Sequence, residues 1–202
     1  MLKKISLILL LAPIILQAAE LESEEDPGLV VFRDRCMACH LTTGMGIRAM
    51  NAPSIAGLPR WYVSDQLRKF RRDQRGYHEE DESGHLMQAN AAALDERSIA
   101  FVGRHIENLK ANRNRNTLEA QVSRQSEELY KSECADCHGE QAEGKRSERI
   151  PPLTRQQDWY LLRQMENFKT GKRSHDEETT ITLTDEDTNA VIAWITELPG
   201  EK

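Results

Sequence analysis

Two short motifs combine side chains that can act together chemically. Cys36-Met-Ala-Cys39-His40 recurs as Cys134-Ala-Asp-Cys137-His138, so two cysteines followed directly by a histidine appear twice. Two thiols one helical turn apart can each form a thioether with a porphyrin vinyl group, and the adjacent histidine can then ligate the iron. The pattern therefore predicts two covalently bound haem c groups (iron). The predicted thioether-forming residues are Cys36, Cys39, Cys134 and Cys137, and the predicted proximal iron ligands are His40 and His138.

Other chemistry is open to the same cysteines. A structural zinc site could take all four thiols, and each Cys-x-x-Cys pair could instead be oxidised to a disulfide in an exported redox protein. The zinc interpretation leaves His40 and His138 without a role and joins cysteines from separate copies of the motif. The disulfide interpretation lacks the βαβ pattern of a thioredoxin. We therefore favour haem over both.

Most of the chain consists of a tandem repeat of one sequence unit, with an offset of 98 residues between the two motifs. The positions that keep this offset are Phe32/Tyr130, Pro53/Pro151, Ile55/Leu153, Trp61/Trp159, Tyr62/Tyr160, Gln66/Gln164 and Phe70/Phe168. Beyond Phe70 the register changes, because 94–109 matches 183–198 at an offset of 89. The second copy is therefore nine residues shorter in between. Such internal repetition predicts two similar structural units.

The spacing of apolar residues predicts an all-α fold. Helices are expected over 27–39, 60–72 and the stripe that ends at Leu109, and over 126–137, 158–169 and 184–198 in the second copy. Pro27 suits a helix start, and Thr184 before Asp187 suggests a capping box. The Asn- and Arg-rich stretch between the copies has the composition of a linker. The predicted organisation is a first domain at 20–110, a linker at 111–125 and a second domain at 126–202.

Residues 1–19 have the layout of a secretory signal peptide, with Lys3 and Lys4 before an apolar run. The run is too short to span a bilayer easily, although an uncleaved membrane anchor is the alternative. Removal of residues 1–19 would change the net charge from -6 to -8, since only two lysines are lost. An acidic chain with no basic excess does not favour nucleic-acid binding. We expect a periplasmic protein with no transmembrane helix after signal removal.

Residues 27–198 resemble the tandem diheme class I cytochrome c family. The resemblance is carried by both Cys-x-x-Cys-His motifs, the paired prolines, the Trp-Tyr pairs with their following glutamines and phenylalanines, and the closing helices. It implies two tandem domains, each a small helical bundle wrapped round a covalently attached haem. It also implies that the carbonyl groups of Pro53 and Pro151 accept hydrogen bonds from the motif imidazoles. Gln66 and Gln164 could reach a haem propionate, the opposite domain or only solvent.

The resemblance implies a methionine as the distal ligand of each haem, and the two copies differ here. Met87 precedes the closing helix of the first copy and is our expected ligand of haem 1. The competing residues are Met45, Met50, His78 and His85. The second copy lacks an equivalent, and its only methionine, Met165, stands where the first copy has Leu67 on an apolar helix face. We expect His175 to ligate haem 2, with an open or water-bound iron and Lys172 as alternatives.

These features favour a periplasmic electron carrier over an enzyme. Its expected partners are redox proteins, an electron donor and an acceptor, among them a membrane-bound oxidase or dehydrogenase. One alternative is a haem enzyme such as a peroxidase, or a small-ligand sensor, that uses an open distal face on haem 2. Another is the cytochrome subunit of a larger oxidoreductase, such as a dehydrogenase. A methionine ligand raises the reduction potential, so unequal ligands predict two different potentials.

Overall fold

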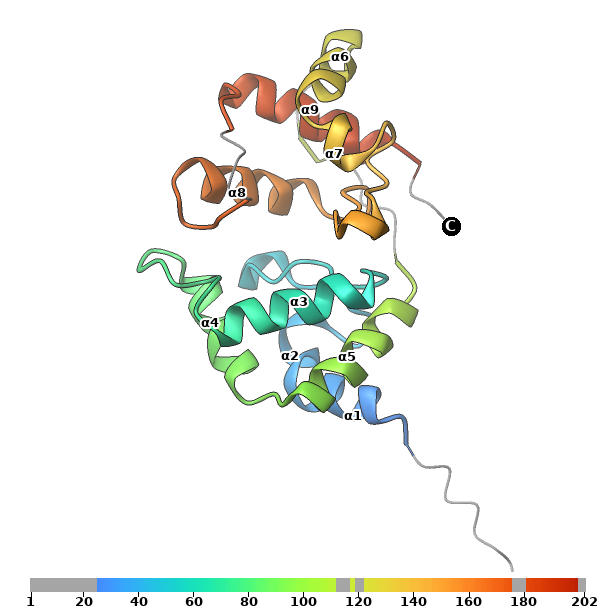
Figure 1. Cartoon of the computed structure of the whole chain (residues 1–202), viewed down its shortest axis with the longest axis vertical. Helices are drawn as coiled ribbons and strands as arrows, with labels where there is room; N and C mark the ends of the chain where they lie inside the picture. The colour runs from blue at the N-terminus through green and yellow to red at the C-terminus, as the bar shows by residue number, and fades with distance from the viewer. Residues whose placement is uncertain (1–24, 112–116, 119–121, 176–180, 200–202) are drawn as a thin grey trace, which may run out of the picture.

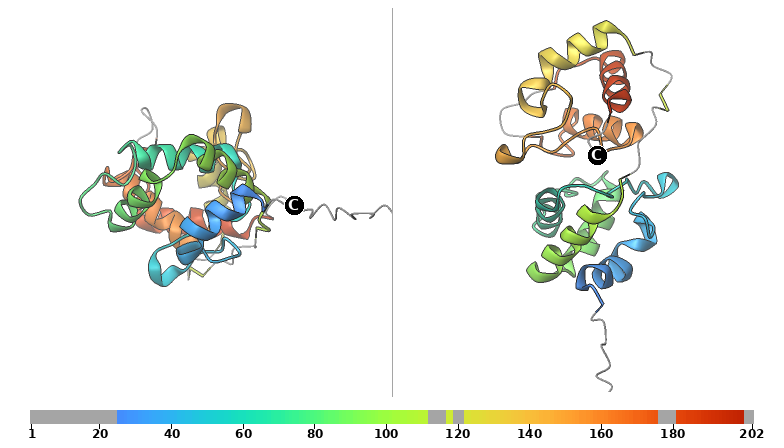
Figure 2. Two further views of the ribbon diagram at one scale, coloured as in Figure 1. Left: turned by 90° about the horizontal axis from the view of Figure 1, so that it is seen from below. Right: turned by 90° about the vertical axis from the view of Figure 1, so that its right-hand side faces the viewer.

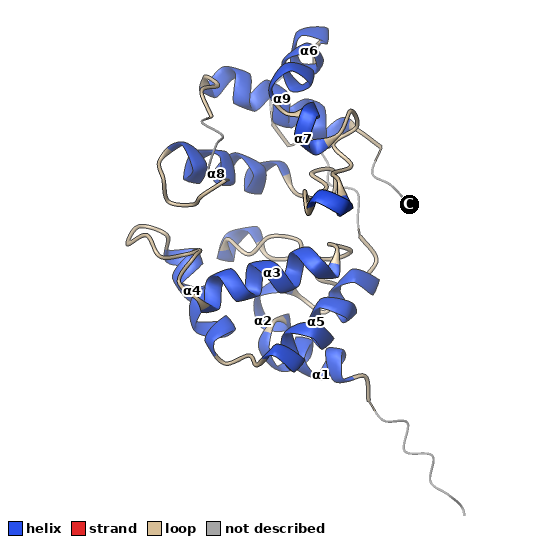
Figure 3. Cartoon of the chain, in the orientation of Figure 1, coloured by secondary structure: helices blue, strands red, loops and turns tan. Residues whose placement is uncertain are grey.

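The computed structural model describes residues 25–111, 117–118, 122–175 and 181–199, and the predicted all-α fold is confirmed over these ranges. The first unit contains α1 (Pro27–Arg35), α2 (Met37–His40), α3 (Arg60–Arg71), α4 (Glu82–Ala92) and α5 (Glu96–Asn108). The second contains α6 (Arg124–Glu133), α7 (Ala135–His138), α8 (Asp158–Lys169) and α9 (Asp185–Glu197) (Figures 1 and 3). The predicted signal peptide at 1–19 lies outside the described residues. Within them, no helix has both the length and the apolar character that a membrane span requires.

The first helix of each unit breaks at the first cysteine of the motif. We expected one continuous helix over 27–39, but Cys36 adopts φ −115° and separates α1 from the single turn α2. Cys134 does the same between α6 and α7, with φ −129°. The residue after each motif histidine has positive φ, 61° at Leu41 and 84° at Gly139. The motif therefore forms a compact turn of its own, which a 3.6-residue periodicity cannot reveal.

The first and last helices of each unit pack against each other and contribute part of its core. Phe32 of α1 is buried against Ile99, Val102 and Ile106 of α5. Asp26 caps α1 by accepting a hydrogen bond from the Gly28 backbone N–H, with Pro27 at the first helical position as expected. In the second unit Tyr130 packs on Trp194 with ring centroids 4.6 Å apart. Burial of these apolar faces is the main force that holds each pair of helices together.

Helix α4 was not expected from the sequence. The Asp81 side chain caps α4 by accepting a hydrogen bond from the Gly84 N–H. The helix has no clear apolar stripe, because Leu86 is exposed and the end of the helix is rich in alanine. It lies in the part of the first unit that is nine residues longer. Met87 consequently lies within a helix rather than in a loop. The capping of α9 by the Thr184 side chain, which accepts from Asp187 N–H, agrees with the sequence.

The two units stack along the long axis of the molecule, with α3 and α8 on the two sides that face each other (Figures 1 and 2). The interface is polar. Gln157 Oε1 accepts from the Ser54 N–H at 2.9 Å, and Gln156 Nε2 donates to the Ser54 carbonyl at 3.0 Å. Arg155 donates to the Gly57 carbonyl, and these two residues are themselves 98 positions apart. Equivalent positions of the two copies therefore meet at the interface, so an approximate twofold axis relates the two units.

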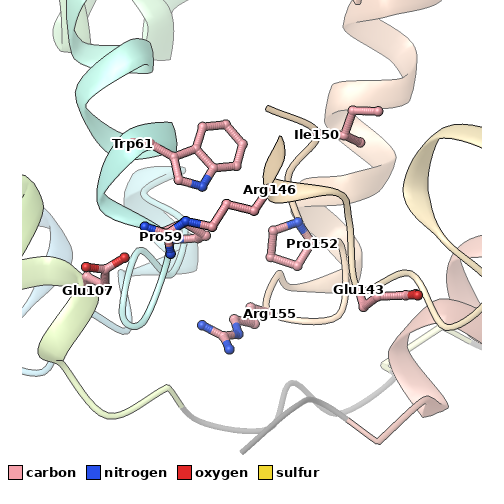
Figure 4. A pocket seen from close by; sticks show the side chains of 8 residues that line it. All are labelled: Pro59, Trp61, Glu107, Glu143, Arg146, Ile150, Pro152 and Arg155. Carbon is pink, nitrogen blue, oxygen red and sulfur yellow. The ribbon is translucent and has the colours of Figure 1, made fainter. Parts of the chain in front are cut away.

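One departure from this symmetry leaves a pocket of about 190 Å³ between the units (Figure 4). On one side Gln157 Nε2 reaches the carbonyl of Met45 and its Oε1 binds Ser54. On the other side the position that matches Gln157 in the repeat is Pro59. Proline has no side-chain amide with which to reach across, and Pro59 lines the pocket together with Glu143 and Pro152.

The close α1–α5 crossing predicts that Gly28→Ala destabilises the first unit. A Cβ at Gly28 would lie 2.5 Å from the Phe101 carbonyl oxygen. Overpacking costs about 1–3 kcal/mol, whereas the higher helix propensity of alanine returns at most about 1 kcal/mol. Guanidinium denaturation of the holoprotein, followed by circular dichroism, should show an earlier first transition. Ala100→Ser, which adds one atom at an exposed site on α5, is the control, and equal midpoints would contradict this packing.

Candidate haem sites

Each motif histidine is held by the predicted proline. His40 Nδ1 lies 2.9 Å from the Pro53 carbonyl oxygen, and His138 Nδ1 lies 3.2 Å from that of Pro151. Because a carbonyl only accepts, this bond places the proton on Nδ1 and leaves Nε2 as the atom that can ligate a metal. His40 is only 6% exposed, and its burial lowers the pKa of the imidazole. The neutral form that a metal ligand requires is therefore favoured.

All four cysteines are thiols in the structure, so the disulfide interpretation is not supported. Burial raises the pKa of the Cys36 thiol to about 12 and that of Cys134 to about 11. The cysteine pairs belong to separate units. Among the described residues, no three His, Cys, Asp or Glu side chains gather where they could hold a metal ion. The structure therefore gives no support to a shared zinc site.

Met87 lies half-buried on α4 and packs against the core cluster of the first unit, which includes Phe70 and Ala91. Its competitors are less favourably placed. Met50 is 50% exposed, His85 is exposed, and the His78 Nδ1 accepts from the backbone N–H of Glu80. Met45 is half-buried in the loop after α2.

His175 is brought beside the motif histidine of the second unit. The ring centroids of His138 and His175 are 6.1 Å apart, with 50° between the ring planes. Two imidazoles that bind one metal from opposite sides, each at about 2 Å, have centroids roughly 6 Å apart. Phe168 contacts His175 edge-on at 4.9 Å. Lys172, the remote alternative, forms an ion pair with Glu80 of the other unit at 2.6 Å.

Two arginines at the centre of the interface were not predicted from the sequence. Arg75 is 8% exposed and donates to Gln66, Tyr160 and Gln164. Arg173 donates to the matching residues Gln164, Tyr62 and Gln66. Of the alternatives left open for the two glutamines, contact with the opposite domain is the one that these hydrogen bonds show. Arg75 and Arg173 keep the 98-residue offset, so continuing the repeat alignment past Phe70 would have found them.

These residues fit a covalently attached haem in each unit. In the first unit, apolar side chains that are only partly buried pack against the core: Val31, Cys36, Met37, Ile55, Tyr62, Met87 and Leu109. Such surfaces gain stability when a large apolar ring covers them. The donor set also fits, with two thiols and a tautomer-fixed imidazole per unit.

Comparison with known proteins agrees with this geometry. The model of the cytochrome c family matches residues 26–110 and 123–199. A thiosulfate dehydrogenase electron acceptor from Thiomonas intermedia is 29% identical over 178 residues, which cover 81% of this chain and 78% of that protein. The thiosulfate dehydrogenase structure of Marichromatium purpuratum has a TM-score of 0.66 at 26% identity, covering 86% of this chain and 40% of that one.

The cytochrome c4 structure of Acidithiobacillus ferrooxidans shows the same fold, with a TM-score of 0.68 and 23% identity. It covers 82% of this chain and 99% of that chain. The family implies covalently bound haem c, and the two matched segments coincide with the two motif-bearing units. The chain therefore belongs to the cytochrome c family, as a tandem diheme member.

Proposed function

We propose that this chain is a periplasmic carrier of single electrons with two unlike haem sites. Haem 1 is held by Cys36 and Cys39 and ligated by His40 and Met87. Haem 2 is held by Cys134 and Cys137 and ligated by His138 and His175. The observation that carries the proposal is the repeated motif with its histidine–proline hydrogen bond, placed on both sides of one interface.

The protein itself binds each haem, orients the ligand of its iron and shields the site from water. When bound, each haem iron takes up and releases one electron. The histidine–proline bond fixes the imidazole plane and makes Nε2 a stronger donor. The crossed helices α1 and α5 exclude water from one side of the first site. The polar interface fixes the distance between the two sites, because it ties the loop after each motif histidine to the other unit.

The unlike distal ligands give electron flow a direction. A methionine ligand raises the reduction potential relative to a second imidazole. With Met87 as its ligand, haem 1 would have the higher potential, and electron transfer from haem 2 to haem 1 would be downhill in free energy. The nine-residue difference between the units, which gives the first unit α4 and Met87, is the source of this asymmetry.

The relatives suggest the electron donor. Two relatives carry the name thiosulfate dehydrogenase electron acceptor. We infer that this chain accepts electrons from an exported thiosulfate dehydrogenase and passes them to a further redox protein. All four of its cysteines belong to attachment motifs, which leaves none to ligate a haem iron at which thiosulfate could be oxidised. The oxidation of thiosulfate therefore takes place on the partner. Residues 1–19 would direct export. Thiosulfate should reduce the purified protein only after a thiosulfate dehydrogenase is added.

One observation favours a second function. His175 is exposed, so an exogenous ligand can compete for its place on haem 2. In that case the protein would be a peroxide-reducing enzyme or a gas sensor. Carbon monoxide binding to the reduced wild-type protein and a high-spin ferric signal would support this function. A low-spin protein that does not react with carbon monoxide would support the carrier.

The double variant Cys134→Ala/Cys137→Ala should keep one haem and lose the other. Without both thiols no thioether anchors haem 2, whereas the first unit is untouched. Intact-protein mass spectrometry and a pyridine haemochrome assay should show a fall from two haems per chain to one. Ser132→Ala, near the same motif but outside it, is the control and should retain two. A double variant that still carries two covalently bound haems would refute covalent attachment at this motif.

His175→Ala should change the ligation of haem 2 alone. Loss of the distal imidazole should convert one low-spin ferric signal to high spin in electron paramagnetic resonance, and carbon monoxide should then bind to half of the haem. Ser174→Ala alters the same loop without removing an imidazole and should leave both signals unchanged. Identical spectra for His175→Ala and the wild type would contradict the assignment of this ligand.

Met87→Ala should lower the potential of haem 1 only. Removal of the thioether leaves the ferric state better stabilised, and we expect a fall on the order of 0.1–0.3 V, within the ~0.8 V range that axial ligands span. Spectroelectrochemistry resolves the two waves. Met50→Ala removes an exposed methionine of the same unit as the control. If Met50→Ala moves the wave and Met87→Ala does not, the ligand is Met50.

A further inference from the structure

The pocket beside Pro59 has walls from both units (Figure 4). The first unit contributes Pro59, Trp61 and Glu107, and the second contributes Glu143, Arg146, Ile150, Pro152 and Arg155. One water molecule takes about 30 Å³ of the liquid, so a pocket of about 190 Å³ has room for several waters or for a small ligand. None of its residues belongs to the arginine, glutamine and tyrosine cluster described above. We call it the Pro59 pocket.

The repeat explains why this place is open. On the other side of the interface the position that matches Pro59 is Gln157, whose side chain spans the gap and accepts from the Ser54 N–H at 2.9 Å. Ser54 in turn matches Pro152 of the pocket. Because a proline replaces the amide on the Pro59 side, the polar groups that face the pocket are left to bind water or a ligand.

Three hydrogen-bond donors of the pocket have unused capacity. The indole N–H of Trp61 is buried and has no acceptor among the described residues. The Arg146 guanidinium forms no hydrogen bond or ion pair with the described part of the chain, and Arg155 donates to one carbonyl, that of Gly57. A guanidinium group has five N–H donors. A buried donor without an acceptor costs free energy, so the pocket favours a ligand that accepts hydrogen bonds.

The two glutamates of the pocket do not neutralise its arginines. Glu107 accepts from the Arg60 backbone N–H at 3.0 Å and pairs with the Arg60 side chain at 3.8 Å. Glu143 accepts from a backbone N–H of its own loop at 2.8 Å, and in Figure 4 its side chain points away from Arg146 and Arg155. Over the described ranges, neither of these arginines has a carboxylate within 4.0 Å of its guanidinium group. Two such cations at one pocket attract an anion.

We propose that the Pro59 pocket binds one small, doubly charged oxyanion of the sulfate or thiosulfate class. Arg146 and Arg155 supply charge-assisted hydrogen bonds, and the indole of Trp61 supplies a neutral one. These donors come from the start of α3, from the 3-10 turn Arg146–Glu148 and from the loop before α8. Donors from three separate segments suit the oxygens of a tetrahedral anion better than a flat carboxylate.

The bound anion joins the two units on the side where no glutamine does. Trp61 belongs to the first unit, and both arginines belong to the second. An anion that binds only the assembled pocket stabilises this placement of the units by mass action. At an anion concentration 100 times its Kd, the equilibrium constant for separating the units falls by about 100-fold. Binding involves no haem iron and no distal ligand, so the inference goes beyond the proposed function and does not depend on it.

The test is the titration of the reduced holoprotein with sulfate at constant ionic strength. Calorimetry gives the Kd and the stoichiometry, and nitrogen–proton correlation spectra follow the indole N–H groups of the three tryptophans. Trp61→Phe identifies the resonance of Trp61. Sulfate should shift this resonance saturably, with one ion bound per chain, and should leave those of Trp159 and Trp194 in place. Thiosulfate should compete with sulfate, and chloride should produce no saturable shift.

Arg146→Gln should raise the Kd for sulfate by about tenfold, because a charged hydrogen-bond donor is lost. Arg48→Gln is the matched control, since Arg48 is the exposed counterpart of Arg146 in the repeat and does not line the pocket. It should leave the Kd unchanged. Arg155→Lys keeps the charge and loses the planar fork, so it should weaken binding. If Arg146→Gln does not accumulate, Arg155→Lys decides.

Glu107→Gln gives a readout of opposite sign. The amide still accepts from the Arg60 N–H, but one negative charge at the pocket is removed, so sulfate should bind more tightly. The proposal is overturned if sulfate does not shift the Trp61 resonance, if chloride shifts it equally, or if Arg48→Gln weakens binding as much as Arg146→Gln. Haem content is measured in parallel. A chain without haem would refute the proposed function, whereas a chain with two haems that does not bind sulfate would refute only this inference.

Discussion

In each unit the motif histidine donates its Nδ1–H to a proline carbonyl thirteen residues later. This bond connects the turn that contains both cysteines to the loop that precedes α3 or α8. In the first unit the residue after that proline, Ser54, is in turn held by Gln156 and Gln157 of the second unit. The orientation of one imidazole is therefore coupled to the packing of the whole interface. Repositioning one unit would disturb a bond that sets the basicity of a proposed iron ligand.

The interface owes its specificity to polar side chains rather than to apolar area. Glutamines and arginines reach backbone carbonyls and phenols whose positions repeat about an approximate twofold axis. Hydrogen bonds of this kind contribute modestly to stability, but breaking a buried one is costly. Such an interface selects one relative placement of the units. For two redox centres that exchange electrons, a fixed separation matters more than a large binding energy.

The asymmetry between the units has one structural origin. The nine additional residues of the first unit lie in the segment that includes α4, where Met87 packs on the core. The matching segment of the second unit is nine residues shorter, and there the ring centroid of His175 lies 6.1 Å from that of His138. A short difference in chain length therefore changes which side chains this segment offers, while the histidine–proline hydrogen bond is the same in both units.

The sequence by itself determined the motifs, the repeat and most helices, because these depend on local spacing: α3 and α8 begin and end within one residue of the prediction. It did not predict the break at Cys36 or helix α4, since neither has a periodic apolar signature. Only the tertiary structure brought His175 to His138 and crossed Arg75 with Arg173. Those contacts join residues far apart in the chain, and a side chain's partner across an interface depends on how whole helices pack, which local spacing does not encode.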